Sequence, residues 1–425
     1  MLEQFSEIIQ QGMQQGYSDI HLTGGHPLVY RQKGTLHFDR NLQWRHRELD
    51  FLVQRLLGPG EMEVFRQQMS VDIARTIGAV RVRINIYNTL RGLSLAIRLL
   101  PGHPPDLAKL NLHPSIADFC QLKTGLLLVG GGAGTGKSTT IAAMVEEINR
   151  TQSLHIITLE APVEYRFRSK KSFVEQRELG THFPSYDQGL MDVLRETPDL
   201  IVVGELRDPE TIRLTVNAAE AGHLVIASLH ATNTEDAFYR LCNSFPADMQ
   251  DLVRNQLASS LSLMLIQKLI HLDAHGFHVP LLAILKGTPA VKSMVRENRL
   301  SQIETTLQTG SREGMFSMET YYAKFIAPQT RFISPVETFR PSAEKSPEIA
   351  YQSALFRGAR PIASPSVTHE GLAGRRNHDE DASTSYEIQE EATMIELIEE
   401  LKREERRKAG ADQVPDGGGV SSDRA

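Results

Sequence analysis

The sequence predicts an α/β protein, in which a small α+β domain precedes a larger domain with a mainly parallel sheet, C-terminal helices and a disordered tail. Three observations lead to this fold class. Short, unbroken apolar runs alternate with helical stretches from Gly125 to about Asp273, as is typical of parallel strands covered on both faces. The preceding hundred residues combine a helical pattern with short alternating segments. Five residues rich in Pro and Gly, 101–105, separate the two patterns.

The composition is that of a globular chain. Of its 425 residues, 40% are hydrophobic and 23% are charged, and the mean hydropathy is -0.27. This length predicts two or three globular units. No apolar run approaches the roughly 20 residues that span a bilayer, and the N-terminus lacks a signal-peptide pattern. The two cysteines, Cys120 and Cys242, lie far apart, which argues against a disulfide framework or a cysteine zinc site. We therefore expect a cytoplasmic protein.

The negative charge is concentrated at the C-terminal end. Residues 341–425 hold 17 acidic and 11 basic residues, which leaves 35 of each before residue 341 and accounts for the whole net charge of -6. A core without a dominant positive field argues against non-specific nucleic-acid binding as the main activity. No nucleic-acid partner is expected.

The first domain is predicted at 1–100 and is followed by a linker at 101–110. Apolar residues recur at helical spacing between Leu2 and Met13, which predicts an opening helix. Strands are expected at 18–22, 28–31, 81–88 and 93–100, with a turn near Arg91 and Gly92 joining the last two.

The second domain is predicted at 111–340. Its four apolar runs predict strands at 126–129, 155–159, 200–203 and 224–228; a turn at 273–276 separates two further apolar runs, and helices are expected from 289 to about 327. Residues 341–425 contain few large apolar side chains, so we expect them to be mostly disordered. Within them, 387–408 has an apolar stripe at helical spacing; a solvated helix is favoured there over a partner-binding one.

The strongest chemical signal is a complete G-x-x-x-x-G-K-[ST] loop between a predicted strand and a predicted helix. Its residues are Gly131, Gly132, Ala133, Gly134, Thr135, Gly136, Lys137 and Ser138, followed by Thr139. Backbone N–H groups of such a loop enclose phosphates, the lysine reaches the β- and γ-phosphates, and the Ser138 hydroxyl binds Mg²⁺. The loop therefore predicts an ATP and Mg²⁺ site.

Acidic residues and histidines flank the neighbouring predicted strands. Glu205 ends the run at 200–203, where ligands bind in open α/β sheets, and is expected to hold the metal shell or orient water. Glu160 and Glu164 follow the run at 155–159. His223 and His230 bracket the run at 224–228; from the residues alone, each is as consistent with a structural as with a catalytic role.

Taken together, these segments resemble the secretion-type hexameric ATPases and, among them, the PilT-type retraction motors of type IV pili. Four motifs of that family occur in order: the P-loop, a counterpart of the Asp box at 157–165, the Walker B strand ending in Glu205, and a His box from Gly222 to His230. The segment 289–297 resembles a C-terminal helix motif associated with retraction. The resemblance covers about residues 1–340, and the two cysteines favour the retraction class over relatives with a four-cysteine zinc element.

The resemblance implies a PAS-like first domain and a RecA-like second domain. It further implies a homo-hexamer in which Arg83, Arg91 and Arg98 act on the nucleotide of a neighbouring subunit, while Glu205, Glu160, Glu164 and His230 act in catalysis. The implied activity is ATP hydrolysis that powers pilus retraction and twitching motility at the inner membrane, through a platform protein, with other pilus ATPases as further partners. The sequence departs from the family at Ala161, where an aspartate is usual.

Three alternatives remain open. Loss of the carboxylate at Ala161 fits a weakly hydrolysing accessory retraction ATPase, unless Glu160 and Glu164 suffice. A related secretion or pilus-assembly ATPase would share the same motifs. A nucleic-acid translocase would need a basic channel with aromatic side chains, which the balanced charge of the core does not favour.

Overall fold

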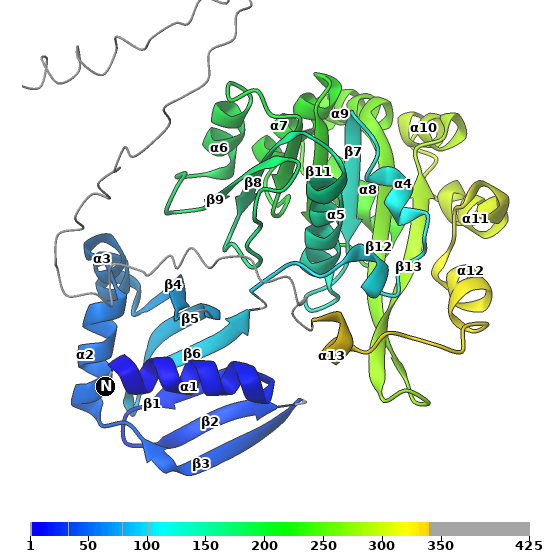
Figure 1. Ribbon diagram of the computed structural model, residues 1–425. Coiled ribbons are helices and arrows are strands. Elements are labelled where there is room, and N and C mark those ends of the chain that lie inside the picture. Colours follow the sequence, from blue (N-terminus) through cyan, green and yellow to red (C-terminus); the bar gives the residue numbers. More distant parts are fainter. Residues whose placement is uncertain (1, 33, 79, 101, 340–425) are drawn as a thin grey trace, which may run out of the picture. The chain divides into compact units, whose positions relative to one another are not determined.

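The computed structural model describes residues 2–339 except 33, 79 and 101, and these residues form two sheets with flanking helices (Figure 1). The predicted fold class is confirmed. The proposed tail at 341–425 and its helix at 387–408 lie outside the described residues. The limits 1–100, 101–110 and 111–340 stay predictions, although the two sheets have separate hydrophobic cores, one drawn from residues 5–99 and the other from residues 107–326.

The first sheet has the strand order β3-β2-β1-β6-β5-β4, and every neighbouring pair is antiparallel. Its elements are α1 (Leu2–Gln15), β1 (Tyr17–Thr23), β2 (Pro27–Gln32), β3 (Thr35–Gln43), α2 (His46–Leu56), α3 (Pro59–Gln68), β4 (Ser70–Ile77), β5 (Val80–Thr89) and β6 (Gly92–Leu100). In β5, Val82, Ile84 and Ile86 are buried. Because side chains alternate along a strand, Arg81 and Arg83 lie on the face away from this core.

The second sheet has the order β13-β12-β7-β11-β10-β8-β9; its strands are parallel to their neighbours except for the edge strand β13. The strands are β7 (Gly125–Gly130), β8 (His155–Glu160), β9 (Phe173–Glu178), β10 (Leu200–Val203), β11 (Leu224–Leu229), β12 (Leu261–Leu272) and β13 (Phe277–Lys286). The helices are α4 (Ile116–Phe119), α5 (Lys137–Thr151), α6 (Tyr186–Val193), α7 (Pro209–Glu220), α8 (Thr234–Asn243), α9 (Ala247–Ser260), α10 (Pro289–Arg296), α11 (Gln302–Thr309), α12 (Met318–Tyr321) and α13 (Pro335–Thr338). Shorter elements are the 3-10 helices η1 (Leu107–Lys109) and η2 (Gly310–Glu313) and the π-helix η3 (Tyr322–Ile326).

The central strands are apolar throughout because both faces are covered. In β7, Leu126 and Leu128 join a cluster with α6 to α9, whereas Leu127 and Val129 join a second cluster with α5. This burial fixes the carboxyl ends of β7, β8, β10 and β11 at one edge of the sheet. No helix in the described part of the chain is both long and apolar enough to span a membrane.

The strands and the opening helix expected from the sequence are confirmed, with ends that differ by a few residues. Sequence patterns missed α2, α3, β3, β4 and β9. The two cysteines are buried, Cys120 beside α5 and Cys242 in α8, at 0% and 2% exposure. Burial raises the pKa of the Cys120 thiol to about 12 and that of Cys242 to about 11.

Candidate nucleotide site

The P-loop connects β7 to α5, as its motif requires. Gly131 has φ 154° and Gly136 has φ 88°, conformations that residues with a side chain rarely adopt. The Lys137 ammonium donates hydrogen bonds to the carbonyl oxygens of Gly131 at 2.9 Å and Gly132 at 2.8 Å. Burial lowers the pKa of Lys137, against the opposing effect of Glu205 and Glu164. The positively charged ammonium of Lys137 therefore lies against the backbone of the loop.

A cavity of about 310 Å³ adjoins the loop. It brings together eight of the residues predicted from the sequence, namely Ala133, Lys137, Ser138, Glu160, Glu164, Glu205, His230 and Arg83. These residues come from the ends of four neighbouring strands, from the loop after β8 and, for Arg83, from β5. The cavity is the place in the described structure where phosphate-binding and acidic groups meet.

Glu205 shares its carboxylate between two partners. Its Oε1 lies 3.1 Å from Nε2 of His230, and its Oε2 accepts a hydrogen bond from Nε of Arg207 at 2.7 Å. Parallel pairing of β10 with β11 brings Glu205 and His230 to the same edge, because Val203 is level with Ala227. His230 can therefore orient the Glu205 carboxylate toward the cavity.

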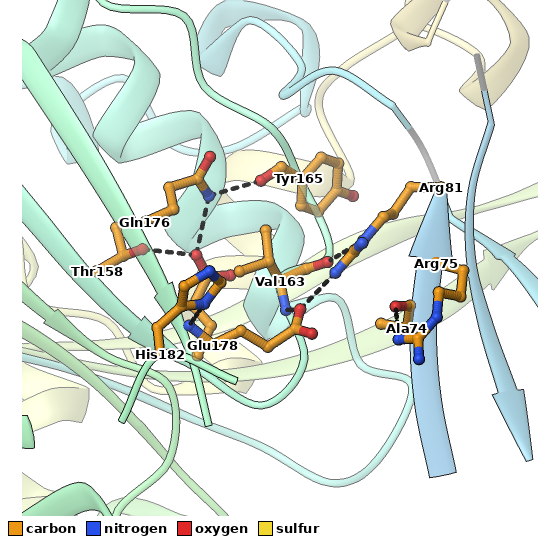
Figure 2. A network of polar contacts seen from close by, with 10 residues as sticks. Ala74, Arg75, Arg81, Thr158, Val163, Tyr165, Gln176, Glu178 and His182 are labelled. Carbon is orange, nitrogen blue, oxygen red and sulfur yellow. Dashed lines mark hydrogen bonds and ion pairs between the residues drawn. The ribbon is translucent and has the colours of Figure 1, made fainter. Parts of the chain in front are cut away.

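Glu160 lies deeper, at the end of β8. Its Oε1 accepts hydrogen bonds from Thr158 Oγ1 at 2.7 Å and from Gln176 Nε2 at 3.0 Å; Figure 2 shows both donors. Gln176 also donates to the carbonyl oxygen of Tyr165. Burial raises the pKa of Glu160 to about 7, although these hydrogen bonds oppose the shift. A carboxyl group with this pKa can exchange a proton near neutral pH.

This shift predicts a pH-dependent stability. Compared with the unfolded chain, the folded protein favours the protonated form of Glu160. The contribution of this group to the free energy of unfolding is therefore complete below pH 4.5 and is lost as the pH rises through about 7. Relative to Glu160→Gln, the wild type should lose roughly 2 kcal/mol of unfolding free energy between about pH 5 and about pH 8. Urea unfolding of both proteins measures the difference; parallel pH profiles would contradict the assignment.

Glu164 and Thr139 are engaged within the site. Burial raises the pKa of Glu164, against the Ser138 hydroxyl and the positive charges of Arg83, Arg98 and Lys137. The Thr139 hydroxyl lies 2.8 Å from that of Tyr165, which lines the cavity.

The three predicted arginines differ in placement. Arg83 lines the cavity of its own chain, and its Nε donates to Asp72 Oδ2 at 2.8 Å, which raises the pKa of Arg83. Arg98 pairs with Asp19 at 2.9 Å. Arg91 is exposed in the turn between β5 and β6, and its side chain has no ion pair with any residue the structure describes. Neither Arg91 nor Arg98 lines the cavity.

His223 lies elsewhere. It precedes β11 at the amino end of the strand, where its Nδ1 is 2.8 Å from the Pro198 carbonyl oxygen. That edge is opposite to the P-loop, so the structure does not bring His223 to the cavity.

A buried ion pair beside the site was not predicted. Arg81 of β5 pairs with Glu178 of β9, and its Nε donates to the carbonyl oxygen of Val163 at 3.2 Å (Figure 2). Glu178 also accepts a hydrogen bond from the Val163 amide at 3.0 Å. Both charged side chains are about one-tenth exposed. The contact links the first sheet to the segment that carries Glu160 and Glu164.

The cavity residues fit Mg²⁺. Ser138, Glu164 and Glu205 supply hydroxyl and carboxylate oxygens, which are the ligands this hard cation prefers. No group of three or more acidic, histidine or cysteine side chains among the described residues could hold a metal by itself.

The strand–loop–helix arrangement and this cavity define a P-loop ATPase. Residues 2–320 match the family described as "Type II/IV secretion system protein", and the chain belongs to that family. It hydrolyses ATP, as the sequence predicted.

Individual relatives agree with this assignment. The "Uncharacterized protein YggR" of Escherichia coli K12 is 39% identical over 74% of this chain and 96% of its own length. The "Type IV pilus retractation ATPase PilT" of Pseudomonas aeruginosa is 34% identical over 74% of this chain and 91% of its own. A crystal structure of "the Pilus Retraction Motor PilT and Bound ADP" has a TM-score of 0.67, 35% identity, and covers 76% of this chain and 97% of that one. The resemblance to PilT-type ATPases is confirmed.

Proposed function

We propose that this chain is the subunit of a hexameric, ATP-driven motor that powers type IV pilus retraction from the cytoplasmic side of the inner membrane. The observation that carries the proposal is the cavity that joins Lys137 and Ser138 to Glu205, in a chain alignable with nearly the whole of PilT. A membrane platform protein would receive the force, and other pilus ATPases would be further partners.

The chain's own residues account for hydrolysis. Loop amides and Lys137 bind the phosphates, and the Glu205 carboxylate orients the attacking water while His230 holds that carboxylate in place. Glu160 and Glu164 line the same cavity as Glu205 and supply a proton acceptor. When bound, Mg²⁺ would be held by Ser138 and the nearby carboxylates and would neutralise charge on the phosphates.

In a ring of subunits, Arg91 can act on the nucleotide of a neighbouring subunit. Arg83 and Arg98 are neutralised by Asp72 and Asp19, whereas Arg91 is exposed at its turn. Arg91 is therefore the arginine best suited to reach the nucleotide of a neighbouring subunit.

Subunit mixing tests this role. Lys137→Ala and Arg91→Ala proteins should each be inactive, and an equal mixture should regain activity because about a quarter of interfaces in a random ring pair one intact loop with one intact arginine. Phosphate release measures recovery. Arg66→Ala, on the exposed face of α3, is the matched control and should be fully active alone. No recovery after demonstrated subunit exchange would contradict action between subunits.

The direction of force is tested in cells that carry this gene and make type IV pili. A chromosomal Lys137→Ala variant should leave pili on the surface and abolish twitching motility if the motor retracts them. Loss of pili would instead identify an assembly ATPase, and unchanged pili with lost protein export would identify a secretion ATPase.

Ala161 supports one variant of the proposal, a weakly hydrolysing accessory subunit, which would show slow phosphate release from the purified wild type. Added nucleic acid should not change that rate.

A further inference from the structure

A single glutamine of β12 holds the P-loop from outside the cavity. Gln267 is 1% exposed and is not among the residues that line the cavity. Its Nε2 donates a hydrogen bond to the Thr135 carbonyl oxygen at 2.7 Å, and its Oε1 accepts one from the Thr140 hydroxyl at 2.8 Å. The amide thus bridges the loop and the first turn of α5.

The chemistry of the two partners fixes the orientation of this amide. A carbonyl oxygen can only accept a hydrogen bond, so the end of Gln267 that faces Thr135 must be the NH₂ group. The remaining oxygen then faces Thr140, whose hydroxyl donates to it. Both ends of a buried polar side chain are satisfied by groups of the P-loop region.

Two glycines of the motif lie too close to Gln267 to be replaced by larger residues. Parallel pairing places Ile266 level with Gly130, so Gln267 lies beside Gly131. A Cβ at Gly131 would be 2.5 Å from the Gln267 carbonyl oxygen, and a Cβ at Gly136 would be 2.8 Å from its Nε2. The backbone and side chain of Gln267 therefore occupy the space that larger residues at the ends of the loop would need.

We propose that Gln267 is a positioning residue for nucleotide binding. By holding the Thr135 carbonyl away from the cavity, it keeps the adjacent loop amides directed toward the phosphates, and through Thr140 it fixes the helix end that completes their binding site. A loop that is already ordered loses little conformational entropy when it binds nucleotide. Gln267 therefore acts on nucleotide affinity rather than on the chemical step. The inference rests on the ATP site alone and is independent of pilus retraction.

Gln267→Met tests the proposal because it keeps the length of the side chain and removes both hydrogen bonds. The dissociation constant for a fluorescent ADP analogue and the KM for ATP should each rise about 10-fold, as expected for two lost hydrogen bonds, while kcat at saturating ATP changes by less than about 3-fold. Lys268→Met, at the next and exposed position of β12, is the control and should leave both unchanged. Unchanged affinity in folded Gln267→Met would overturn the proposal.

Thr140→Val gives a second test if Gln267→Met does not fold. It retains the shape of the side chain and removes only the hydroxyl, and should weaken ADP binding about 3-fold; Thr140→Ser should restore it. A variant that lowers the melting temperature but leaves ADP affinity unchanged would show a merely structural bridge and would overturn the proposal. Where both single variants fold, the loss of ADP binding free energy in the double variant should be smaller than the sum of the losses in the two single variants. Additive losses would show that the two residues act separately.

Discussion

Replacing Lys137 with alanine should lower ATP hydrolysis by at least about 100-fold and leave the protein folded, because the variant loses the P-loop charge that stabilises the transferring phosphoryl group. Lys137 is half-buried, and among the residues that the structure describes its ammonium donates hydrogen bonds only to the loop carbonyl oxygens of Gly131 and Gly132. Its removal takes no side chain from the hydrophobic clusters. The folded state should therefore tolerate the change.

Phosphate release and thermal unfolding, measured on the same preparations, separate activity from stability. Lys171→Ala is a suitable control because Lys171 is exposed and its backbone amide, which bonds to Asn149, is retained. Wild-type turnover by Lys137→Ala would remove the P-loop from the mechanism.

Replacing Glu205 with glutamine should preserve nucleotide binding and reduce hydrolysis by at least about 100-fold. The amide has the shape of the carboxylate, so contacts with His230 and Arg207 can persist, but it lacks the negative charge that orients water and metal.

The measurements are the affinity for a fluorescent ADP analogue and single-turnover hydrolysis of ATP. Glu210→Gln, in the exposed first turn of α7, removes an equivalent charge outside the cavity and should have no effect on either. If Glu205→Gln fails to bind nucleotide, Glu205 supports the loop rather than the reaction.

The site residues that the sequence predicts come from local patterns. The P-loop occupies eight consecutive residues, and Glu205 comes two residues after the end of a four-residue apolar strand, so neither requires knowledge of distant pairing. His230 reaches Glu205 because adjacent parallel strands end together, which the strand pattern already implied.

The features that were missed depend on contacts between distant segments. Gln176 reaches Glu160 only because β9 pairs with β8, and the polar pattern of β9 did not identify it as a strand. Arg81 and Glu178 are 97 residues apart, and Gln267 is 132 residues from Thr135. No local spacing encodes such pairs; covariation among homologous sequences is the signal that would have found them.

The burial of Cys120 and Cys242 has a practical consequence for labelling this ATPase with dyes. Thiol reagents attack exposed thiolates, and both native thiols are enclosed and held in the neutral form. A maleimide dye should therefore leave the native protein unlabelled and react with a cysteine introduced at an exposed position. One dye on the exposed surface of α3 and another on α8 would then report any change in the distance between these two helices during ATP hydrolysis, without first removing either natural cysteine.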